Sequence, residues 1–74
     1  MAYVVYGKRT ERWYNSDTNQ WNEPDTNFRA LDGRGIRVNK LQDACLYATR
    51  EDAQEFIDSH SFRDGVKLEI RKKN

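Results

Sequence analysis

The feature that most constrains this chain is a capped amphipathic helix near its C-terminus. Thr49 stands at an expected helix N-cap, with an acid three residues later in the manner of a capping box. Apolar residues then recur at the spacing of one helical face, at Ala53, Phe56 and Ile57. This pattern predicts a helix from Arg50 to about Ser59.

A strictly alternating segment follows the helix. Residues 66–71 read Val-Lys-Leu-Glu-Ile-Arg, which is typical of a strand buried on one face only. If the helix packs on that strand, the apolar residues face it, and Lys67, Glu69 and Arg71 face the other way. Asp64-Gly65 predicts the turn before the strand. Residues 72–74 are expected to be a frayed tail.

The remaining elements are short and β-like. Residues 3–9 predict a first strand and residues 12–14 a second. Residues 28–31 and 36–38 predict a hairpin around an Asp-Gly turn, and residues 44–48 a further strand. The prediction is a single α+β domain over 1–74, with a small, mostly antiparallel sheet and one helix packed on one face.

A long polar segment, residues 15–27, interrupts this pattern and is expected to be a loop. Its acids do not have the register of a calcium-binding loop. Trp21 lies alone within it. We expect Trp21 to fold back on the core as a lid, with a protruding binding anchor as the alternative.

Composition narrows the function. The chain has 74 residues, a net charge of +1, one Cys and one His, too few nitrogen and sulfur ligands for a zinc site. The single Cys suits a reducing cytoplasm, and no apolar run approaches membrane-spanning length. We expect no cofactor, no metal and no catalysis. A tiny ribonuclease is the enzymatic alternative, and His60 and Cys45 are read as structural.

Charge is segregated along the chain. The helix segment 49–60 carries −3, whereas segments 29–40 and 66–74 each carry +3. A sheet face that bears Tyr, Arg and Lys suits single-stranded RNA, but alternating charges on a strand more often mark a solvated or protein-docking face, and that interpretation is favoured. The candidate macromolecule-binding residues are Tyr3, Tyr6, Trp21, Arg34, Arg37, Lys67 and Arg71.

Two motifs resemble a known group of proteins. Residues 44–49 read A-x-L-Y-x-T, and residues 51–57 read E-x-A-x-x-F-I. This order resembles small accessory proteins of bacteriophages and mobile elements. A fainter likeness is to the DNA-binding arms of phage integrases, from which the segment 15–27 and the last strand depart. The first resemblance implies binding to a host or defence protein, or to a host toxin.

Together these features predict a small, cytoplasmic, non-catalytic and phage-encoded binding module. It would modulate a host or defence macromolecule by protein–protein contact, as a monomer or a homodimer. RNA or DNA binding by the aromatic-basic sheet face is the alternative.

Overall fold

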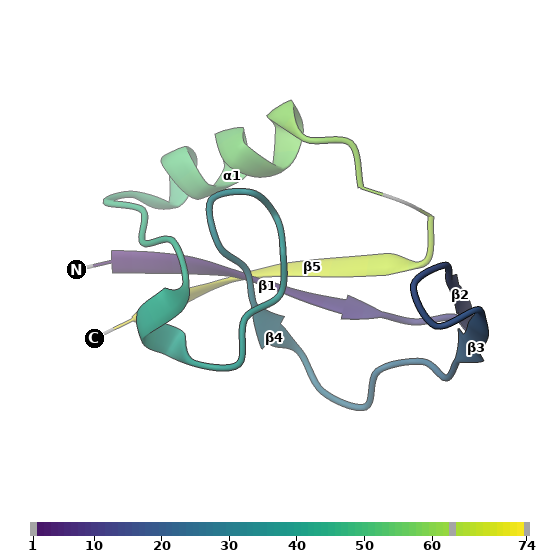
Figure 1. Ribbon diagram of the computed structural model, residues 1–74. Helices are drawn as coiled ribbons and strands as arrows, with labels where there is room; N and C mark the ends of the chain where they lie inside the picture. Colours follow the sequence, from purple (N-terminus) through teal and green to yellow (C-terminus); the bar gives the residue numbers. More distant parts are fainter. Residues whose placement is uncertain (1, 63, 74) are drawn as a thin grey trace.

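The computed structural model describes residues 2–62 and 64–73. In chain order its elements are β1 (Ala2–Arg9), β2 (Trp13–Asn15), β3 (Gln20–Asn22), β4 (Arg29–Ala30), the 3-10 helix η1 (Leu41–Asp43), α1 (Arg50–Ser59) and β5 (Val66–Lys73) (Figure 1).

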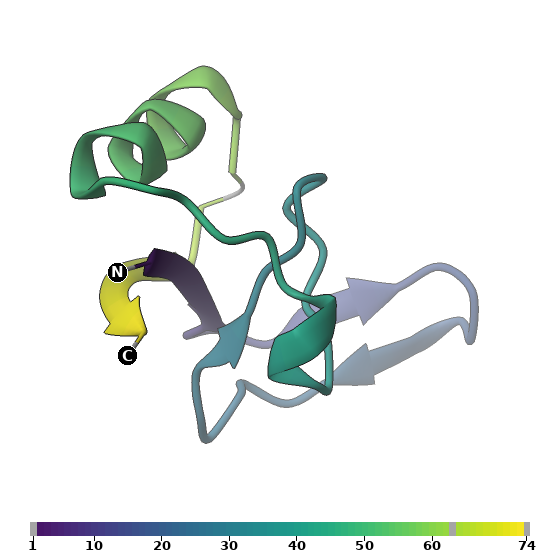
Figure 2. The ribbon, with the colours of Figure 1, turned by 90° about the vertical axis from the view of Figure 1, so that its left-hand side faces the viewer.

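The described strands form two small antiparallel sheets. One has the order β4-β1-β5, and the other is the hairpin of β2 and β3. Helix α1 lies over one face of the larger sheet (Figures 1 and 2). The α+β class is therefore confirmed.

The helix has the predicted bounds because its start is encoded locally. The Thr49 side chain accepts a hydrogen bond from the backbone N–H of Asp52 at 3.1 Å, as an N-cap should. On its inner face, Ala53 and Phe56 are buried. They form the core with Val5 and Leu31, and a ring of partly buried side chains surrounds it: Tyr3, Tyr47, Ile57, Phe62, Leu68 and Ile70.

The pleat of β1 and β5 sorts side chains between the two faces of the sheet. Val5 pairs with Ile70 on the helix side, whereas Tyr6 pairs with Glu69 on the opposite side. Leu68 and Ile70 contact the core, as expected. The opposite face is not bare, however. Val4 on that face is only 1% exposed. The 3-10 helix η1 and the chain between β3 and β4 both lie on this side of the larger sheet (Figure 1).

The segment 44–48 is not the predicted strand. It meets β1 at one isolated bridge, in which Tyr3 and Tyr47 exchange backbone hydrogen bonds of 2.8 and 2.9 Å. Cys45 donates its N–H to the Leu31 carbonyl at 3.1 Å, and it is only half-buried. The segment crosses β1 near the start of that strand on its way into α1, so its pairing with β1 is limited to this bridge (Figure 1).

The polar segment 15–27 is more ordered than expected. Its middle forms β3, which pairs with β2 across a turn where Asn19 adopts a left-handed φ of 56°. Trp21 lies in β3 and is 60% exposed, so the lid interpretation is wrong. The cause is local, because Trp21 pairs with Tyr14 on the hairpin and not with the core.

The last strand is longer than predicted. β5 continues to Lys73, because Lys72 pairs with Tyr3 and Lys73 pairs with Ala2. Positions 72 and 73 of the expected tail are therefore strand, and Asn74 lies outside the described residues. The turn before β5 is as expected, with Gly65 at a φ of 84°.

Candidate interaction surfaces

The most exposed aromatic surface is one side of the β2–β3 hairpin. Tyr14 and Trp21 lie directly opposite each other in the register, with ring centroids 5.7 Å apart in an edge-to-face arrangement. The Arg12 guanidinium lies 5.6 Å from the Trp21 ring and 3.5 Å from Glu23. We call Arg12, Tyr14 and Trp21 the hairpin face.

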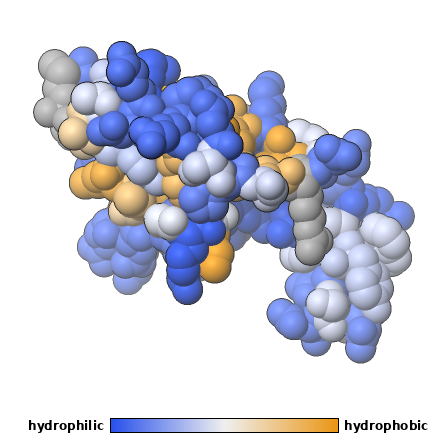
Figure 3. All heavy atoms as spheres, turned by 90° about the horizontal axis from the view of Figure 1, so that it is seen from above, coloured by the Kyte–Doolittle hydropathy of each residue, from blue (hydrophilic) through white to orange (hydrophobic). Residues whose placement is uncertain are grey.

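The hairpin stands away from the rest of the molecule. Figure 2 shows it extending sideways from the larger sheet, and in Figure 3 it forms a separate lobe at the right. Tyr14 is 45% exposed and Trp21 is 60% exposed. The Tyr14 hydroxyl donates to the Asn19 side chain at 3.0 Å, which fixes the ring against the turn. This hydrogen bond and the ring contact with Trp21 orient the hairpin face.

A carboxylate fixes the base of the hairpin. Asp25 accepts the backbone N–H of Arg9 at 2.8 Å and also pairs with the Arg37 guanidinium. Burial alone would raise the pKa of Asp25, but the Arg9 N–H and the Arg37 guanidinium outweigh it and lower that pKa. On the inner side of the hairpin, the Arg9 guanidinium lies 3.6 Å from the centroid of the Trp13 ring. Arg37 therefore has a structural partner.

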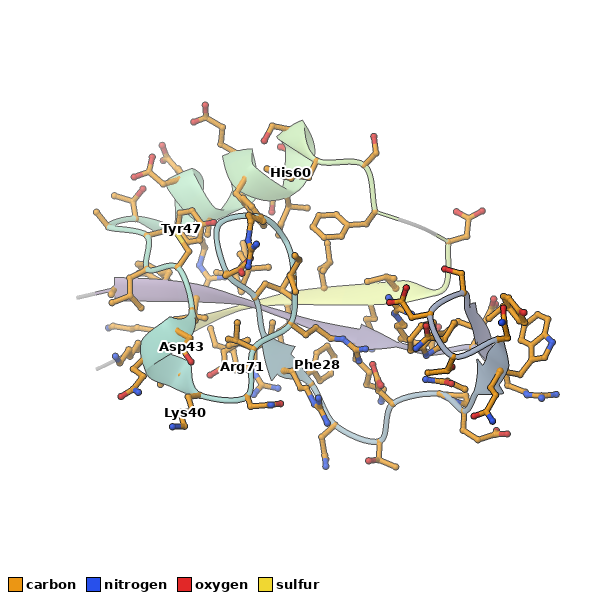
Figure 4. The ribbon with its side chains drawn as sticks, in the orientation of Figure 1. Phe28, Lys40, Asp43, Tyr47, His60 and Arg71 are labelled. Carbon is orange, nitrogen blue, oxygen red and sulfur yellow. The ribbon has the colours of Figure 1, made fainter. Side chains whose placement is uncertain are left out.

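The sheet face opposite α1 carries a second aromatic-basic group. The Arg71 guanidinium lies 4.4 Å from the Tyr6 ring and 5.2 Å from the Phe28 ring, and it pairs with Glu69 at 2.8 Å. In Figure 4, Arg71 and Phe28 lie together on the side of the sheet away from α1. The Lys8 ammonium lies 5.5 Å from the centroid of the same Phe28 ring.

The structure divides the seven candidate residues among several places. Tyr6, Lys67 and Arg71 share the face opposite α1. Tyr3 is on the helix side, where the Arg50 guanidinium lies 5.5 Å from its ring. Arg34 lies at a loop tip and pairs with Asp32 at 2.9 Å.

Trp21 and Arg37 complete the set, on the hairpin face and at the base of the hairpin. Tyr14, Arg12 and Phe28 are not among the residues predicted from the sequence. The alternation of Arg12 with Tyr14, just before a turn-rich segment, was the available signal for the first two.

Two hollows adjoin these surfaces. The larger, of about 420 Å³, lies between the base of the hairpin, the loop at Gly35–Arg37 and the chain that precedes β5. The smaller, of about 400 Å³, lies beside Tyr6 and Phe28. Cations outnumber acids in the lining of the larger hollow, where Lys8, Arg9, Arg12, Arg29 and Arg37 accompany Glu11 and Asp64.

His60 and Tyr47 have side chains that can exchange protons, and both pack against the aromatic core. The His60 ring packs against the Phe56 ring at a tilt of 39°, with the centroids 4.2 Å apart, and its Nδ1 lies 2.9 Å from the Phe56 carbonyl oxygen. Burial raises the pKa of the Tyr47 hydroxyl, with the Cys45 thiol adding to the effect. Among residues 2–62 and 64–73, no three His, Cys, Asp or Glu side chains are grouped as metal ligands.

Comparison with known proteins gives no relative: neither a family model, nor a curated protein, nor a solved structure matches this chain. In the part of the chain that the structure describes, no helix combines the length and apolar character needed to cross a bilayer.

Proposed function

We propose that this protein is a non-catalytic binding module that docks on a partner protein through the hairpin face. The observation that carries the proposal is the exposure of Trp21 and Tyr14, 60% and 45%, side by side on a projecting hairpin. Trp, Tyr and Arg are the residue types that dominate the binding free energy at protein interfaces. The hairpin face contains one of each.

The fixed geometry of the hairpin face supports the same function. The Trp21 ring packs edge-to-face against the Tyr14 ring, and the Tyr14 hydroxyl donates to the Asn19 side chain. Side chains that are already ordered lose less conformational entropy when they bind. A pocket on a partner protein could therefore take the Trp21 ring at little cost in ordering.

Charge favours a protein over a nucleic acid at this surface. The hairpin from Arg12 to Glu23 has one cation and two acids, so phosphates gain little from it. Elsewhere, Arg34, Arg37 and Arg71 each pair with a carboxylate of the same chain. Electrostatic capture of a phosphate backbone would have to compete with those three pairs.

The resemblance to phage and mobile-element proteins suggests the kind of partner. It favours a host or defence protein of the bacterial cytoplasm, with this chain acting as a modulator. Nucleic-acid binding is the second candidate, and the group of Tyr6, Phe28 and Arg71 with Lys8 is the observation that favours it.

The test is affinity capture from a bacterial lysate with matched variants, followed by titration of the purified partner. Trp21→Ala is expected to weaken binding about 30-fold or more, the loss typical of an interface hot spot of about 2 kcal/mol. Leu46→Ala is the control, because Leu46 is also an exposed apolar residue, at 50%, but lies far along the chain from the hairpin.

Two outcomes would contradict the proposal. A partner retained equally by the Trp21→Ala variant would show that the hairpin face is not the contact. Capture of RNA or DNA, with an affinity that falls steeply as salt rises, would favour the second candidate instead.

A further inference from the structure

Strand β5 forms an open edge of the larger sheet. It is an outer strand in the order β4-β1-β5 and is 8 residues long. Among the described residues, no backbone hydrogen bond is found that joins residues 66–73 to anything other than β1. Figure 2 shows β5 at the outer side of the sheet, with no strand beyond it. Such an edge is a template for a further strand.

The backbone hydrogen bonds of β1 show which of its backbone groups face away from β5. Tyr3 exchanges hydrogen bonds with Tyr47, and the Val5 carbonyl accepts from Leu31 at 2.9 Å. Both Tyr47 and Leu31 lie on the β4 side of β1. Because backbone groups alternate along a strand, Val4 and its alternate neighbours direct theirs to β5.

The register then assigns the backbone groups of β5. Val4 pairs with Arg71, so Arg71 directs its N–H and C=O back to β1. By the same alternation, Leu68, Ile70 and Lys72 direct theirs outward, where an added strand would bind. Lys72 is exposed, which leaves its end of the edge accessible to solvent.

Charge decides what kind of strand fits. β5 has four cations, at positions 67, 71, 72 and 73, and one acid, Glu69. A second copy of this chain would bring one +3 edge against another, and like charges on adjacent strands repel. An acidic strand is attracted by the same side chains.

We infer that β5 accepts an extended acidic segment of a partner protein as an added strand. Its acids lie beside Lys67 and Arg71 on the face opposite α1, and its alternate residues are apolar and lie beside Leu68 and Ile70. This inference is independent of the hairpin face, because Trp21→Ala leaves β5 unchanged and the variants below leave the hairpin unchanged.

The experiment uses a fluorescent synthetic peptide of eight residues in which Glu alternates with Val. A matched peptide with Lys in place of Glu is the control. Fluorescence anisotropy is expected to show the Glu peptide binding at least about tenfold more tightly than the Lys peptide. Amide hydrogen exchange is expected to slow at Leu68, Ile70 and Lys72 when the Glu peptide binds.

Two variants of one residue separate backbone pairing from charge. Lys72→Pro removes an outward N–H but no hydrogen bond to β1, which is the edge position where proline is tolerated. Lys72→Ala removes the same charge and keeps the N–H. The proline variant is expected to bind the Glu peptide about threefold to tenfold more weakly than the alanine variant.

The inference is overturned by any of four results: no binding of the Glu peptide, binding that leaves the three amides unprotected, equal affinities for the two Lys72 variants, or protection of these amides by oligo-dT in place of the peptide. A thermal melt of each variant shows whether the fold is retained. If Lys72→Pro does not fold, the exchange data alone decide between strand addition and loose charge attraction.

Discussion

At the scale of single residues, the chain is held together by a few polar contacts outside its small core. Asp25 is the clearest case, since it joins the end of β1 to the loop that contains Arg37. Its own N–H also donates to the Arg9 carbonyl at 2.9 Å. Its lowered pKa means that the native state favours the carboxylate.

Asp25→Ala is expected to lower the free energy of unfolding by about 1.5–3 kcal/mol at pH 7, because two charge-assisted hydrogen bonds are lost. Because the pKa of Asp25 is lowered in the native state, its carboxylate stabilises the fold fully above the ordinary pKa of 3.8. This stabilisation is lost as the pH falls through the lowered native pKa. The difference between wild type and variant should therefore shrink in acid. Urea unfolding at pH 7 and at pH 3 measures it.

Asp17→Ala is the matched control for this prediction, because Asp17 is an exposed acid of the hairpin turn. It should change stability little at either pH. A difference between wild type and the Asp25 variant that stayed the same from pH 7 to pH 3 would argue against a stabilising carboxylate.

At the scale of elements, the predictions agree best with the structure where an element depends only on residues close together in the sequence. Helix α1 has the predicted bounds because its cap and its apolar face lie within a few turns of chain. By contrast, residues 44–48 have the composition of a strand but make one bridge. A strand needs a partner of matching length, and composition does not show whether one is available.

Thr49→Ala is expected to lower the free energy of unfolding by about 1 kcal/mol, because the N–H of Asp52 loses its side-chain acceptor. Circular dichroism during urea titration measures the change. Thr26→Ala is the control, since Thr26 is exposed and outside any helix or strand. Equal losses in the two variants would mean that the cap adds nothing to stability.

At the scale of the whole molecule, a very small core supports an elongated body of 40 × 23 × 19 Å. The buried cluster comprises Val5, Leu31, Ala53 and Phe56. Phe56 also contacts other rings, with its centroid 5.5 Å from that of Tyr47 and 6.2 Å from that of Phe62. One aromatic side chain thus links α1, β1 and the chain on both sides of the helix.

Phe56→Ala is expected to cost about 3–5 kcal/mol, which matches the lower end of the stability of about 4–11 kcal/mol for a domain of this size, the end expected for a core this small. The variant should be largely unfolded at 37 °C by circular dichroism. Trp21→Ala, by comparison, should melt at nearly the wild-type temperature, because Trp21 lies outside the core. A Phe56→Ala protein with a normal melt would show that the core lies elsewhere.

The sequence by itself determined the helix, the two long strands and the class of the fold, because each follows from periodicity and capping within one stretch of chain. Only the tertiary structure decided which residues share a surface. Trp21 meets Tyr14 through a hairpin that the polar composition concealed, and Arg37 is joined to Asp25 across twelve positions. The outer edge of β5 is likewise open because β4 pairs with β1 and not with β5. Such pairings join residues far apart in the chain, so local pattern does not specify them.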